Sequence, residues 1–97
     1  MVRTSSAGSC SLPNLCGKFV NSTVSKRDLY VVDGWGANGP TGTMVRLPPG
    51  HGSMAYMPDA DGIYASCAFS IGWNRYAGGQ WYKIGDSYNI RTVNVHC

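Results

Sequence analysis

The sequence contains no glutamate, and it has few acidic side chains of any kind. Five aspartates stand against eight lysines and arginines, which gives a formal net charge of +3 at pH 7. Glutamate and lysine are strong helix formers, and only three of the eight basic residues are lysines. The chain is instead rich in glycine, serine, asparagine, threonine and tyrosine, so the composition favours strands and turns over helices.

Long apolar runs and runs of basic residues are also missing. No apolar segment approaches the roughly 20 residues that a membrane-spanning helix needs. The basic side chains are spread along the chain, whereas a nucleic-acid-binding surface needs clustered positive charge, so nucleic acid is disfavoured as a partner. No signal peptide is present, and we expect a secreted form to have lost it.

The chain has four cysteines but no Cys-x-x-Cys pair, which disfavours a zinc site. Four cysteines in a short chain predict two disulfides and therefore an oxidising, extracellular compartment. Three pairings remain open, because spacing alone does not choose among them. The predicted disulfide cysteines are Cys10, Cys16, Cys67 and Cys97.

We expect a flexible N-terminal tail over residues 1–9 and a single β domain over residues 10–97. Residues 63–71 give the clearest strand pattern. Ile63, Ala65, Cys67, Phe69 and Ile71 alternate with smaller or more polar residues, as in a strand that buries one face. This stretch predicts one continuous strand, with those five side chains pointing inward.

Residues 80–84 and 88–95 read as a hairpin around a three-residue loop at 85–87. This register pairs Tyr82 with Ile90 on an apolar face and Trp81 with Arg91 on a polar face, so it sorts the side chains better than a two-residue turn. The pattern fails beyond Arg91, because Val93 and Val95 then share the face of Arg91. A bulge near Thr92, or burial on both sides, would account for that failure.

Further strands are predicted at 17–24, 29–33, 43–47 and 53–57, separated by segments rich in glycine, proline and aspartate. In the strand at 43–47, Val45 and Leu47 point inward and Met44 and Arg46 outward. Residues 34–42, which include Trp35, read as a loop. These patterns predict an all-β protein: a small disulfide-stapled β-sandwich or barrel of six to seven short antiparallel strands.

The aromatic residues are the strongest candidates for a binding surface. Trp35 and Trp73 lie in glycine-rich segments and Trp81 on the polar face, and with Tyr64, Tyr76 and Tyr82 they would form an aromatic platform. Tryptophan, tyrosine and arginine are enriched at protein interfaces, although aromatic rings also serve a small core. The binding candidates are Trp35, Arg46, Trp73, Arg75, Tyr76, Trp81 and Arg91.

Three other patterns carry weaker functional hypotheses. The proline-containing segment at 43–51 could act as the rigid binding loop of a protease inhibitor, with Arg46 entering the specificity pocket of the protease. Asp59 and Asp61, followed by a glycine, would suit a calcium loop, but they also suit an ordinary turn. His51 and His96 would be the acid–base pair of a small ribonuclease. Residues 21–23 form an Asn-Ser-Thr glycosylation sequon, which matters only in a source that glycosylates proteins.

The expected function is that of a secreted, non-catalytic binding protein that acts on another protein, as an inhibitor or a toxin-like effector. No serine–histidine–aspartate motif is recognisable, and disulfide-bonded cysteines cannot serve as nucleophiles. The alternatives are a carbohydrate-binding module using Trp35, Trp73 and Trp81, and a small secreted ribonuclease. We expect no cofactor and no bound metal, and the oligomeric state stays open.

Overall fold

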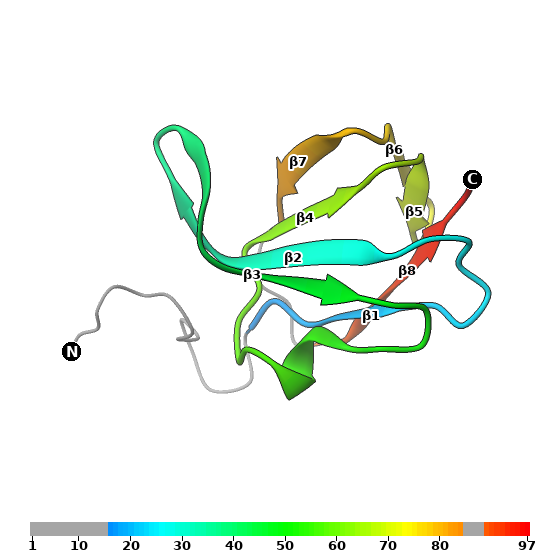
Figure 1. The fold of residues 1–97 in the computed structure, drawn as a ribbon, viewed down its shortest axis with the longest axis horizontal. Helices are drawn as coiled ribbons and strands as arrows, with labels where there is room; N and C mark the ends of the chain where they lie inside the picture. The colour runs from blue at the N-terminus through cyan, green and yellow to red at the C-terminus, as the bar shows by residue number, and fades with distance from the viewer. Residues whose placement is uncertain (1–15, 85–88) are drawn as a thin grey trace.

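The fold is described by a computed structural model of the 97-residue chain, which covers residues 16–84 and 89–97. Strands dominate these residues, with one turn of 3₁₀ helix between the third and fourth strands (Figure 1). In chain order the elements are β1 (Phe19–Asn21), β2 (Leu29–Gly36), β3 (Gly39–Leu47), η1 (Ser53–Ala55), β4 (Gly62–Ala65), β5 (Phe69–Ile71), β6 (Asn74–Tyr76), β7 (Gln80–Lys83) and β8 (Arg91–Val95).

The strands form two four-stranded sheets, ordered β3-β2-β4-β7 and β1-β8-β5-β6. Neighbouring strands in the described residues run antiparallel, except that β1 runs parallel to β8. The all-β expectation is confirmed. The described residues contain eight strands, compared with the six or seven predicted, and the parallel pair was not anticipated.

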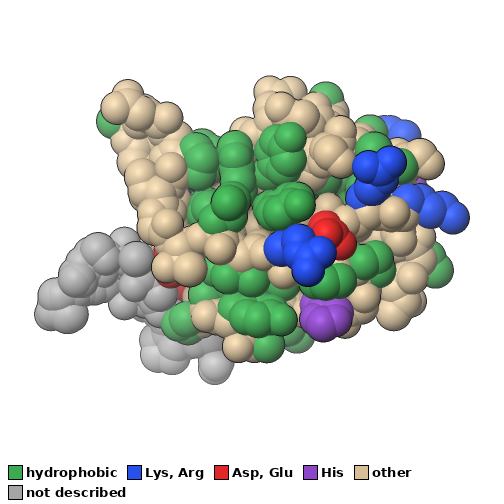
Figure 2. Space-filling view, viewed as in Figure 1, with side chains coloured by type: hydrophobic (Ala, Val, Ile, Leu, Met, Phe, Trp, Pro, Cys, Tyr) green, Lys and Arg blue, Asp and Glu red, His purple; other side chains and the backbone are tan. Residues whose placement is uncertain are grey.

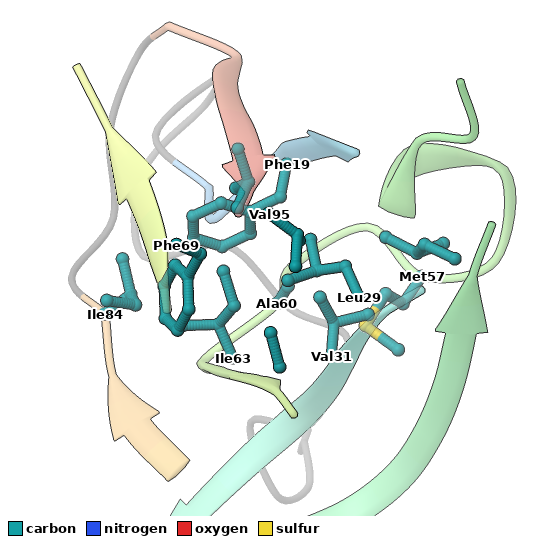
Figure 3. Packing of buried hydrophobic residues seen from close by; sticks show 12 residues of the cluster. Phe19, Leu29, Val31, Met57, Ala60, Ile63, Phe69, Ile84 and Val95 are labelled. Atoms are coloured by element: carbon teal, nitrogen blue, oxygen red, sulfur yellow. The ribbon is translucent and has the colours of Figure 1, made fainter. Parts of the chain in front are cut away.

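The hydrophobic core lies between the inner faces of the two sheets (Figure 3). Val31 and Ile63 project into it from the first sheet, and Phe19, Phe69 and Val95 from the second, each at most 1% exposed. As the pattern of residues 43–47 predicts, Leu47 is buried and Val45 half-buried, while Met44 and Arg46 face solvent. Alternation along each strand thus leaves a second, outward-facing set of side chains on both sheets.

The single strand predicted at 63–71 is wrong, because the chain turns from one sheet into the other at residues 66–68. β4 belongs to the first sheet and β5 to the second. The inward alternation nevertheless holds on both sides of this corner, because Ile63, Ala65 and Phe69 all face the same core. Backbone bonds from Gly79 N–H to the carbonyl of Ala65 and from His96 N–H to that of Ala68 hold the corner in place.

The hairpin predicted at 80–95 is also wrong. β7 pairs with β4, and β8 pairs with β1 and β5 in the other sheet. Its proposed loop at 85–87 lies outside the described residues. Val93 and Val95 are buried, and Arg91 shares their face with its guanidinium 5.6 Å from the ring centroid of Phe19. The failure of the face pattern beyond Arg91 was the sign of this separate pairing.

Two shorter segments differ from their sequence-based assignments. The strand expected at 53–57 is wrong, because this segment contains η1. The buried Ser53 accepts a hydrogen bond from Phe19 N–H through its hydroxyl. Its carbonyl accepts one from Met57 N–H, which closes the helical turn. The loop expected at 34–42 is the outer part of the β2–β3 hairpin, with Trp35 opposite Pro40. This hairpin end projects from the body of the molecule (Figure 1).

Cys67 and Cys97 form a disulfide with their Cα atoms 5.4 Å apart, which selects one of the three pairings left open. Cys16 is disulfide-bonded as well. Cys10 and the tail predicted over residues 1–9 lie outside the described residues. In the part of the chain that the structure covers, no helix has the length and apolar character needed to cross a membrane.

Candidate functional site

A row of large side chains crosses the outer face of the β3-β2-β4-β7 sheet, one from each strand. Arg46 on β3 lies opposite Tyr30 on β2, Tyr30 opposite Tyr64 on β4, and Tyr64 opposite Trp81 on β7. These residues alternate with inward-facing neighbours, which places the whole row on the side away from the core. The register of four strands therefore brings together three aromatic rings and one guanidinium from residues far apart in sequence.

The three rings are in contact along the row. The centroids of Tyr30 and Tyr64 are 5.9 Å apart with the ring planes at 66°, and those of Tyr64 and Trp81 are 5.4 Å apart at 38°. Each ring is half-buried and lies outside the core cluster. Cross-strand aromatic pairs stabilise a sheet by about 0.2–1 kcal/mol each. The outer face of an antiparallel sheet is nevertheless usually polar, so a three-ring row there calls for a further explanation.

A hollow of about 460 Å³ opens beside this row. Hydrophobic side chains gather on this face over β2, β4 and β7 (Figure 2). The volume falls in the range of about 300–1,000 Å³ that is typical of ligand clefts. The lining residues, which we call the aromatic groove, are Arg27, Asp28, Tyr30, Met44, Tyr64, Ser66 and Trp81.

Charged side chains mark one end of the aromatic groove. Arg46 Nη1 donates to Asp28 Oδ2 at 2.9 Å, with the Arg46 side chain 62% exposed and that of Asp28 28% exposed. A surface ion pair of this kind adds at most about 1 kcal/mol to stability, so its main effect is to orient the two groups. Arg27 is exposed on the same side. With two guanidiniums and one carboxylate, this end carries net positive charge.

Trp35 covers the neighbouring part of the same face. The row beside the aromatic one contains Val32 on β2 and Gly62 on β4. A Cβ atom on Gly62 would lie 2.8 Å from both Trp35 Cζ3 and Val32 Cγ2, so the indole lies directly against the glycine. Under this cover Val32 is only 4% exposed. Trp35 therefore extends the apolar face, and the absence of a side chain at Gly62 makes room for it.

Four of the predicted binding residues belong to the other sheet, so they do not join this site. Trp73 is fully exposed in the two-residue turn between β5 and β6, where Gly72 has φ +58°. Arg75 is exposed on β6, and Arg91 lies over Phe19. Tyr76 stacks on Phe69 with the ring centroids 5.0 Å apart and the planes at 10°, at the edge of the core.

The sequence pointed to only part of the groove. Trp81, which lines the groove, was predicted as a binding residue, as was Arg46, which is paired with the lining residue Asp28. Tyr64 was named as part of a possible aromatic platform. Tyr30 was not among the predicted binding residues, because the sequence indicated only a strand at 29–33; the structure places Tyr30 half-buried on the outer face. The segment with Arg46 is a paired strand followed by a turn in which Gly50 N–H donates to the carbonyl of Asn21, so it is held against the body of the protein.

The aspartates proposed for calcium have structural partners. Asp59 is 5% exposed, and its Oδ1 accepts a hydrogen bond of 2.6 Å from Gly17 N–H. Asp61 bonds through its backbone to Val32 and Ile84. Within residues 16–84 and 89–97, no group of three or more histidine, cysteine, aspartate or glutamate side chains could hold a metal ion.

The two histidines have different neighbours. His96 Nε2 lies 2.8 Å from Ser70 Oγ at the end of the second sheet. His51 is exposed in the segment before η1, where its carbonyl accepts from Asn21 N–H. Neither histidine lines the aromatic groove.

No protein-family model, curated protein or solved structure matches this chain.

Proposed function

We propose that this is an extracellular binding protein that holds a partner protein in the aromatic groove. The observation that carries the proposal is the row Tyr30–Tyr64–Trp81, half-exposed on an outer sheet face beside a hollow of about 460 Å³. Tyrosine and tryptophan supply large contact area with few rotatable bonds, and they dominate the energetics of protein interfaces together with arginine. The disulfide between Cys67 and Cys97 favours an oxidising compartment.

The lining of the groove indicates the chemistry of the partner. The rings and the flexible, exposed Met44 would receive an apolar side chain, since methionine adapts to irregular surfaces. Arg27 and Arg46 lie at one end, and Asp28 already shares its charge with Arg46. We therefore infer a partner segment that presents an aromatic or large aliphatic side chain next to a carboxylate. An inhibitor or a toxin-like effector would use such a face to occupy its target without catalysis.

Selection from a random peptide library on the immobilised, oxidised protein tests this proposal. We expect enriched peptides to combine an aromatic or large aliphatic residue with a nearby aspartate or glutamate. Trp81→Ala should weaken their binding about tenfold or more, as loss of an interface tryptophan usually does. Arg27→Ala should weaken only the peptides that carry a carboxylate, and that loss should shrink in high salt.

Trp73→Ala is the matched control, because Trp73 is fully exposed on the other sheet. The proposal would be contradicted by selected peptides that still bind the Trp81→Ala variant but no longer bind the Trp73→Ala variant. A glycan array run in parallel separates the carbohydrate alternative: a sugar bound through Trp81, with no peptide selected, would assign the groove to carbohydrate instead.

A further inference from the structure

The acceptor asparagine of the sequon at residues 21–23 is enclosed by the fold. Asn21 has no exposed surface, and its Nδ2 donates to the carbonyls of Leu47 at 2.8 Å and Arg27 at 3.0 Å. Its backbone is held too, because its N–H donates to the carbonyl of His51 and its carbonyl accepts from Gly50 N–H. This one residue connects β1 to the end of β3 and to the segment before β2.

N-glycosylation acts on the atom that makes these two bonds. An oligosaccharyltransferase joins Asn Nδ2 to the anomeric carbon of a lipid-linked oligosaccharide, the lipid pyrophosphate leaves, and Nδ2 loses one proton. The remaining N–H cannot serve two carbonyls that lie on different segments. The glycan also needs open space around Nδ2, and a side chain with no exposed surface offers none.

We propose that Asn21 is a folding-gated glycosylation site: it accepts a glycan only in the unfolded chain, and attachment of the glycan excludes the native fold. The other two residues of the sequon remain accessible in the folded protein, because Thr23 is exposed and Ser22 is half-buried in the turn that follows β1. Burial of Asn21 Nδ2 alone therefore prevents modification of the folded protein. In a glycosylating secretory pathway, modification and folding of this protein therefore compete.

The test compares the folded, oxidised protein with the same chain after reduction, alkylation and unfolding. Both are incubated with purified oligosaccharyltransferase and lipid-linked oligosaccharide, and occupancy of Asn21 is read by mass spectrometry. A stable domain is unfolded for only about 10⁻³ of the time or less. We therefore expect modification of the folded protein to be at least about a thousandfold slower. Thr23→Ala should abolish it in both states.

A second sequon on the surface provides the matched control. Asn38 is exposed at the tip of the β2–β3 hairpin, and Pro40→Thr gives it the sequence Asn-Gly-Thr. In the Thr23→Ala/Pro40→Thr variant, Asn38 should be modified at similar rates in both states. A glycan at Asn21 on protein that keeps its native fold would overturn the proposal. So would an unfolded chain that stays unmodified at Asn21 while Asn38 is modified.

Discussion

At the scale of single residues, buried polar side chains tie together segments that the sheets alone do not join. Asn21 reaches the carbonyls of Arg27 and Leu47, and Asp59 reaches the N–H of Gly17. The bonds to Leu47 and Gly17 are buried and the bond to Arg27 is part-buried, so removing either side chain leaves a backbone group with little access to water. Their loss should cost more than the loss of an exposed hydrogen bond.

We predict that Asn21→Ala destabilises the protein by about 2–4 kcal/mol, because it removes two hydrogen bonds, one of which is to the carbonyl of Leu47 in a fully buried setting. Urea unfolding of the oxidised protein, followed by tryptophan fluorescence, measures the change. Ser22→Ala is the control: the Ser22 hydroxyl accepts an exposed bond from Val24 N–H, so we expect a loss of about 0.5 kcal/mol or less. Equal losses in the two variants would contradict this role for Asn21.

Gly62→Ala tests the packing of Trp35 on the outer face. The new Cβ would meet Trp35 and Val32 at 2.8 Å, so we predict a loss of about 1–3 kcal/mol from overpacking. Gly36→Ala on the same hairpin is the matched control, because its Cβ would meet the Thr41 methyl at an ordinary 3.4 Å. Thermal unfolding of both variants should separate them; a Gly62→Ala protein as stable as Gly36→Ala would show that Trp35 moves aside freely.

At the scale of elements, the β2–β3 hairpin has two parts. From Tyr30 to Val32 its first strand pairs with both β3 and β4, whereas from Gly34 onward β2 pairs with β3 alone, beyond a register shift. Asp33 Oδ1 accepts from Thr43 N–H beside this shift, at 2.7 Å. Beyond Trp35, which packs against Gly62 of β4, the projecting end is held by this one strand pair.

Amide hydrogen exchange should reflect this division. We predict the fastest exchange in the hairpin at residues 36–42 and the slowest at Val31, Ile63 and Val93, which lie in paired strands and are fully buried. Mass spectrometry after peptic digestion gives the comparison. Protection of residues 36–42 equal to that of Ile63 would mean that another contact holds the hairpin end.

The sequence predicted the faces of the strands better than their partners. The alternation of residues 63–71 was correct for Ile63, Ala65 and Phe69, because inward-facing residues look alike on either sheet. It could not reveal the corner at 66–68, since both sheets enclose one core and the pattern runs through unchanged. Which strands pair depends on contacts between residues far apart in sequence. The hairpin at 80–95 was predicted only from how its own apolar and polar side chains separate onto two faces, and it was wrong.

The aromatic groove was partly predictable for the same reason. An outward position was readable for Tyr64 and Trp81, but their adjacency to Tyr30 depends on the pairing of β2 with β4 and of β4 with β7. Trp73 lies in a glycine-rich segment, as Trp35 does, but it belongs to the other sheet. Only the strand order separates the rings that share a face from the rings that do not.

At the scale of the whole molecule, the Cys67–Cys97 bridge links the corner between the two sheets to the end of β8. It spans a sequence separation of 30 residues. We predict that the double variant Cys67→Ala/Cys97→Ala loses about 3–4 kcal/mol, the loop-closure estimate for a loop of this size. Urea unfolding of the two proteins measures the loss. An unchanged midpoint would show that strand pairing alone holds the corner and the terminal segment.

The parallel pairing of β1 with β8 also constrains how this protein is made. Phe19 lies beside Arg91, and Asn21 beside Val93. The partner of β1 is therefore synthesised about seventy residues after β1 itself. On the ribosome, Phe19 and the rest of β1 have no native neighbour in β8 while the middle of the chain emerges. Such distant pairings form slowly, because a long loop must close first. Until β8 has been translated, the apolar side chains of β1 therefore lack their native neighbours in that strand and are exposed to non-native contacts.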